Sequence, residues 1–117
     1  MDEICKAQKL MFKLMKLASF NNFDGKMVVK NLETHRDLWK SCVMDGNDLI
    51  KLRDLSKNDW NTDTLYILTT GVNDVLLERI AKDLWGADEV TYLDKDEASH
   101  RLGKFPCEDK VLMVWWD

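Results

Sequence analysis

The chain has 117 residues, of which 45% are hydrophobic and 32% are charged, and its formal net charge is −4. This length and composition predict one domain (1–117) with a sizeable core and exclude a disordered chain. The acidic balance argues against nucleic-acid binding as the main role, and no apolar run reaches the roughly 20 residues of a membrane span, so we expect neither kind of partner.

Residues 2–20 have the spacing of an amphipathic helix, with apolar residues recurring every three or four positions and lysines on the opposite side. The simplest interpretation of the lysines is the solvated side of a helix packed on a sheet. Methionines on this helix, with Phe12 off its main apolar side, suggest an extra hydrophobic strip, and such strips mark protein contacts. We therefore expect a homo-oligomer or a protein partner through this helix. The predicted apolar face consists of Ile4, Ala7, Met11, Leu14 and Ala18, with Leu10 and Leu17 beside it.

The next segment has weaker patterns. Met27-Val28-Val29 predicts a short strand over 26–30, and the spacing of Leu32, His35, Trp39 and Cys42 predicts a helix over 32–43. With the first helix, these elements predict a mainly helical part over 1–56.

From Thr64 the pattern alternates between strands and helices. Strands are predicted over 64–70, 89–93 and 110–116. The first connecting helix begins after the cap Asn73, with Val72 and Leu77 as a hydrophobic staple. The second begins after the cap Asp94 and ends at Gly103. The predicted buried stripe of the first connecting helix is Val75, Leu76, Ile80, Ala81 and Leu84.

The last strand indicates how these elements are arranged. Residues 111–116 are apolar without interruption, which is typical of strands covered on both faces in a parallel, helix-flanked sheet. Strand–helix–strand–helix–strand with short connections predicts a right-handed parallel unit over 64–117. We therefore expect a three-layer α/β domain with a mostly parallel sheet of three to four strands. The polar strand 89–93 is placed at an edge, which gives the order 2-1-3, with 26–30 as the fourth strand.

The carboxyl ends of parallel strands are the usual place for ligands in such folds. At that edge the sequence places a strand-to-helix turn with two hydroxyls, a combination that suits an anion, although the turn matches neither common nucleotide-binding motif. An ordinary turn and ordinary helix caps explain the same residues. The candidate ligand-binding residues are Thr69, Thr70, Gly71, Asn73, Asp94 and Asp117.

Other chemistry has little support in the sequence. Asp94, Asp96 and Asp117 are candidates for a magnesium site, but helix capping and solvation explain them better. His35 and His100 have no partner at ligand spacing. The three cysteines, at positions 5, 42 and 107, form no CxxC pair. We therefore expect no metal, no cofactor and reduced thiols in a cytoplasmic protein.

Two functions remain open. The preferred hypothesis is a non-enzymatic domain that acts by protein association, as a homodimer or as a subunit of an assembly. The alternative is a binder of an anionic or nucleotide-like small molecule, or a small enzyme acting on one, at the carboxyl edge of the sheet. No residue is assigned a catalytic role.

Overall fold

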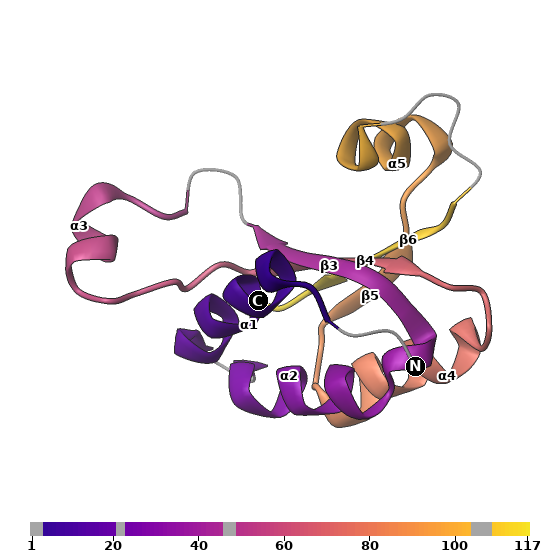
Figure 1. Cartoon of the computed structure of the whole chain (residues 1–117), viewed down its shortest axis with the longest axis horizontal. Helices are drawn as coiled ribbons and strands as arrows, with labels where there is room; N and C mark the ends of the chain where they lie inside the picture. The colour runs from indigo at the N-terminus through magenta and orange to yellow at the C-terminus, as the bar shows by residue number, and fades with distance from the viewer. Residues whose placement is uncertain (1–3, 21–22, 46–48, 104–108) are drawn as a thin grey trace.

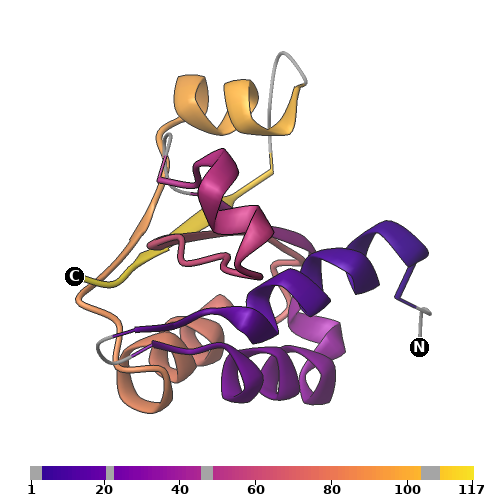
Figure 2. The ribbon, with the colours of Figure 1, turned by 90° about the vertical axis from the view of Figure 1, so that its left-hand side faces the viewer.

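The computed structural model describes residues 4–20, 23–45, 49–103 and 109–117 (Figure 1). A four-stranded sheet separates a layer of helices on its inner face from helix α5 (Lys95–Leu102) on its outer face (Figures 1 and 2). The strands are β3 (Trp39–Asp45), β4 (Thr64–Thr69), β5 (Glu89–Tyr92) and β6 (Val111–Trp115), and β1 (Ser19–Phe20) pairs separately with β2 (Phe23–Asp24). The helices are α1 (Lys6–Leu17), α2 (Gly25–Thr34), α3 (Leu52–Ser56), α4 (Asp74–Arg79) and α5 (Lys95–Leu102), with a 3-10 turn η1 (Arg36–Leu38) and a π-helical turn η2 (Ile80–Leu84) that continues α4.

The sheet is antiparallel throughout, with the order β3-β4-β6-β5. The predictions of a mostly parallel sheet and of the order 2-1-3 are therefore wrong. The three strands predicted over 64–117 exist as β4, β5 and β6, but β6 lies between the other two and runs against both. A central antiparallel strand with helices on both sides is as apolar as a parallel one, so the run over 111–116 does not distinguish the two arrangements.

The fourth strand is β3, and the predictions over 26–30 and 32–43 are wrong. Residues 26–30 belong to α2, which Asp24 caps by accepting a hydrogen bond from the Met27 N–H at 3.3 Å. In β3, a bulge between Trp39 and Ser41 breaks the two-residue alternation. The inward residues Trp39 and Cys42 are therefore three positions apart, which is the interval that resembles a helix in the sequence.

The main core lies between the inner face of the sheet and the helices α1, α2 and α4–η2. An aromatic cluster closes the end of this core next to the last strand. Trp116 packs edge-on against Phe23 at 4.6 Å between ring centroids, and its indole N–H donates to the Trp85 carbonyl at 2.9 Å. Trp115 points to the outer face, where it donates to Asp63. The two adjacent tryptophans thus serve opposite sides of the sheet, as the alternation of a strand predicts.

The outer face of the sheet is packed against fewer buried residues than the inner face. Ala98 of α5 is buried against Val111, with Tyr66, Leu68, Leu93 and Leu102 around them. Helix α3 lies away from the sheet (Figure 1), and none of its residues is buried. Across the described residues, no helix has the length and apolar character to cross a membrane.

Candidate functional site

The structure divides the predicted ligand-binding residues between the two ends of the sheet. The Thr69 N–H donates to the Lys110 carbonyl, and the Leu93 N–H donates to Val111, so Thr69 and Asp94 lie at the same end. Asp117 lies at the other end, where its N–H donates to the Asp88 carboxylate at 2.7 Å. Because neighbouring strands are antiparallel, no edge collects all the carboxyl ends, and these residues do not form one site.

At the first end, Thr69, Thr70 and Gly71 line a hollow of about 230 Å³. The charged residues in its lining are two lysines and two aspartates, which balance each other. The Thr70 hydroxyl donates to the Asp37 carbonyl at 2.7 Å and accepts from the Val72 N–H at 3.3 Å. These bonds hold the turn, and a role of this hollow in anion binding stays a prediction. The two lysines in the lining are Lys40 and Lys110, and the two aspartates are Asp74 and Asp109.

The predicted helix caps are confirmed. Asn73 accepts from the Leu76 N–H at 3.1 Å, and Asp94 accepts from the Glu97 N–H at 2.9 Å. Within the described ranges, no group of three or more histidine, cysteine or acidic side chains is arranged to hold a metal ion. Cys107 lies outside the described residues.

The first helix presents a different face to the core from the one predicted. Its buried residues are Gln8, Phe12 and Met15. Phe12, predicted to lie off the apolar side, is buried and meets the Trp39 ring edge-on at 5.5 Å between ring centroids. The inward face is therefore rotated from the predicted one. This rotation leaves other apolar side chains of α1 facing outward.

We call the outward apolar residues of α1 the α1 stripe. They follow one another at intervals of three, four and three, which is the spacing of a helix-pairing seam. Leu10 is 51% exposed and Leu17 is 40% exposed. Four lysines and no acidic residue accompany them in this helix, so the surroundings of the stripe are positive. The α1 stripe consists of Ala7, Leu10, Leu14 and Leu17, and the lysines are Lys6, Lys9, Lys13 and Lys16.

A pair of hydrogen bonds fixes the rotation of α1. The Gln8 carboxamide donates to the Cys42 carbonyl and accepts from the Cys42 N–H, both at 2.9 Å. Gln8 therefore pairs with the backbone N–H and carbonyl of one residue of the edge strand β3, as a neighbouring strand would. Because both backbone groups are buried, turning the stripe inward would leave them without partners, at a cost of about 1–3 kcal/mol each.

The thiol of Cys42 provides a test of this packing. Burial raises its pKa from the usual 9.0 to about 12, although the hydrogen bond from Gln8 acts to lower it. As the pH rises, the unfolded chain therefore loses this proton before the folded protein does. Below about pH 9 the thiol is protonated in both states, so its titration does not change the free energy of unfolding. As the pH rises from about 9 towards 12, the free energy of unfolding should decrease.

Urea unfolding at several pH values between about 8 and about 10 measures this decrease in the free energy of unfolding. We expect a shallower decrease in Cys42→Ala than in the wild type, and a wild-type decrease in Cys5→Ala, which removes an exposed thiol. Equal slopes in the wild type and Cys42→Ala would contradict the burial of this thiol.

A second outward apolar surface lies at the start of α4. Val72 is 66% exposed and Val75 is 65% exposed, with Leu76 next to them, also exposed. The predicted staple between Val72 and Leu77 is therefore wrong, because only Leu77 is buried. The predicted stripe is correct for Ile80 and Ala81, which face the core, and wrong for Val75, Leu76 and Leu84. We call Val72, Val75 and Leu76 the α4 patch.

The sequence does contain the signal for both surfaces. Positions 7, 10, 14 and 17 have pairing-seam spacing, and residues 72–85 are apolar on more sides than one packed face requires. What sequence alone does not decide is which of the apolar sides faces inward. Comparison of the chain with protein-family models, with curated proteins and with solved structures finds no match.

Proposed function

We propose that this protein acts by association with further copies of itself, the α1 stripe of one copy packing against the α4 patch of the next. The observation that carries the proposal is the presence of two exposed apolar surfaces on well-formed helices whose other sides are already packed in the core. Contiguous exposed apolar surfaces mark protein contacts.

Charge favours this pairing over the pairing of two α1 stripes. Residues 6–17 carry four lysines and no acid, so two such helices facing each other would repel. Residues 72–85 carry three acidic and two basic residues, which gives them the opposite sign. A contact between α1 and the α4 patch therefore brings together apolar surfaces with complementary surroundings.

The two surfaces lie on different helices of the inner layer, so the contact joins unlike patches. Such a head-to-tail contact leaves one surface free at each end of a pair and continues into a ring or an open chain. We therefore expect a subunit of an assembly rather than a closed dimer. We place this assembly in the cytoplasm, because Cys5 and Cys42 are free thiols, as expected in a reducing compartment.

Light scattering after size exclusion tests the proposal. The mass should rise above the 13.7 kDa of one chain as the protein concentration increases, and it should pass the mass of a dimer. The double variant Leu10→Glu, Leu17→Glu should stay monomeric, because association would force two carboxylates out of water into an apolar contact. Leu52→Glu on α3, where the leucine is 88% exposed and belongs to neither surface, is the matched control and should behave as the wild type. A wild type that stays at the mass of one chain up to millimolar concentration would contradict the proposal.

A further inference from the structure

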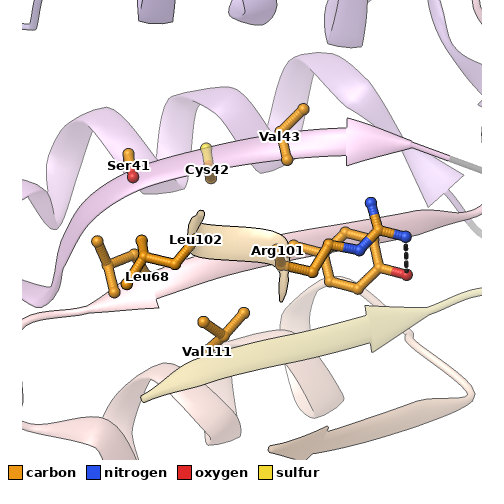
Figure 3. Close-up of a pocket in the computed structure, with 8 residues that line it drawn as sticks. Ser41, Cys42, Val43, Leu68, Arg101, Leu102 and Val111 are labelled. Carbon is orange, nitrogen blue, oxygen red and sulfur yellow. Dashed lines mark hydrogen bonds between the residues drawn. The ribbon is translucent and has the colours of Figure 1, made fainter. Parts of the chain in front are cut away.

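The outer face of the sheet contains a cavity of about 220 Å³ between β3 and α5, and Figure 3 shows the residues that line it. The strand register explains its composition. Ser41 pairs with Leu68, and Leu68 pairs with Val111, so one row across three strands forms the floor. Val43 continues the floor on β3, and Leu102 enters from α5. The walls are therefore mainly aliphatic.

One end of the cavity carries a fixed positive charge. The guanidinium of Arg101 lies 4.0 Å from the centroid of the Tyr66 ring, and its Nη2 donates to the Tyr66 hydroxyl at 3.1 Å. Its Nη1 donates to the Asp45 carboxylate at 2.8 Å. Among the described lining residues, Arg101 alone carries a charge at neutral pH. Asp45 is outside the lining, and its side chain is 47% exposed.

The opposite side of α5 has a different character. A second hollow there shares Tyr66 and Arg101 but is also lined by the acidic side chains of Asp96 and Glu97. These carboxylates repel an anion. The side that faces β3 is therefore the one where an anionic group would meet Arg101 next to apolar walls.

We propose that the cavity between β3 and α5 binds a small monocarboxylate with a compact apolar body, such as one ring or a short branched chain. Its volume exceeds the roughly 150 Å³ of an apolar cavity that accepts benzene, and it is below the roughly 300 Å³ of the smallest drug-sized sites. The apolar body lies on Leu68 and Val111, and the carboxylate accepts hydrogen bonds from Arg101.

The stacked guanidinium is suited to this role. Arginine has five N–H donors in a planar fork, and the hydrogen bonds to Asp45 and Tyr66 leave further donors for a carboxylate. Packing on Tyr66 holds the fork in place, which reduces the entropy lost on binding. Asp45 competes with the ligand for the same guanidinium, and this competition gives the proposal its sharpest test. The site is on the outer face, away from the α1 stripe and the α4 patch, so it stands independently of the proposed association.

The experiment is a titration with benzoate followed by methyl resonances in the protein. Benzoate should shift the methyl signals of Val43, Leu68 and Val111, and benzamide, which has the same shape without the charge, should bind at least tenfold more weakly. Arg101→Gln should lower the affinity for benzoate about tenfold. Asp45→Asn should raise it about threefold or more, because the competing carboxylate is gone.

Arg79→Gln, which removes an exposed arginine from α4 on the other side of the sheet, is the matched control and should leave the affinity unchanged. A thermal melt of each variant shows whether it is folded, and Asp45→Asn still tests the proposal if Arg101→Gln is not. Equal binding of benzoate and benzamide, an unchanged or lower affinity in Asp45→Asn, or no shift of these methyl signals at about 20 mM benzoate would overturn the proposal.

Discussion

Replacing Gly25 by alanine should destabilise the fold by about 3 kcal/mol or more. Gly25 begins α2 directly against the end of α1, where its N–H donates to the Ala18 carbonyl at 3.2 Å. A β-carbon at this position would overlap the Met15 carbonyl oxygen and would lie 2.9 Å from that of Ala18. These are backbone atoms, so they cannot move aside as a side chain could. Urea unfolding followed by circular dichroism measures the loss.

Gly71→Ala separates this clash from the general effect of replacing a glycine. Gly71 has a φ of +81°, but a β-carbon there would meet nothing within 4 Å. Its replacement should cost about 1 kcal/mol from the left-handed backbone alone. If Gly25→Ala proves no more destabilising than Gly71→Ala, the close approach of α1 and α2 is wrong.

Trp116→Ala should cost about 3–5 kcal/mol. Its ring is 1% exposed, packs against Phe23 and Trp85, and donates a hydrogen bond to the Trp85 carbonyl. Removing it leaves a large cavity at the end of the inner core and a buried carbonyl without its indole partner. The same urea titration, monitored by circular dichroism, gives the change in the free energy of unfolding.

The neighbouring tryptophan provides the control. Trp115 lies on the thinly covered outer face, is only partly buried and donates to Asp63. Trp115→Ala should therefore cost only about 1 kcal/mol. Equal costs for the two variants would mean that the outer face is as tightly packed as the inner one.

Much of the local structure could be predicted from the sequence. The strands β4 and β6 follow from apolar runs bounded by turn residues, and β5 follows from a shorter, more polar run. Side-chain caps mark the starts of α4 and α5. Gly103 ends α5 in the left-handed conformation expected of it, with a φ of +73°. These signals are local, because each depends on a few neighbouring residues.

The topology could not be predicted in the same way. The uninterrupted apolar sequence of β6 reflects what covers the two faces of the strand. The direction of the neighbouring strands depends instead on which backbone groups pair. Residues distant in sequence decide that pairing. The predicted gathering of Thr70 and Asp117 at one edge is wrong for the same reason, because they share an edge only if the strands are parallel. In β3, the bulge after Trp39 places the inward residues Trp39 and Cys42 three positions apart, and this spacing resembles that of a helix.

The outward surfaces show a related limit. Both α1 and α4 are apolar on more than one side, so periodicity alone allows several inward faces. On α1 the choice is made by Gln8, a polar residue whose partners on Cys42 are 34 positions away in the chain. Surplus apolar sides on these two helices are therefore the sequence feature on which the proposed association rests, although the sequence does not show which side is free.

The most direct test of the proposed association is to mix two variants, each of which lacks one surface. Val75→Glu disables the α4 patch, and the double variant Leu10→Glu, Leu17→Glu disables the α1 stripe. Each should be monomeric alone. Mixed in equal amounts, they should form a one-to-one pair of twice 13.7 kDa that grows no further, because one intact surface of each kind remains. A Val75→Glu variant that dimerises by itself, or a mixture that stays monomeric, would contradict the head-to-tail contact.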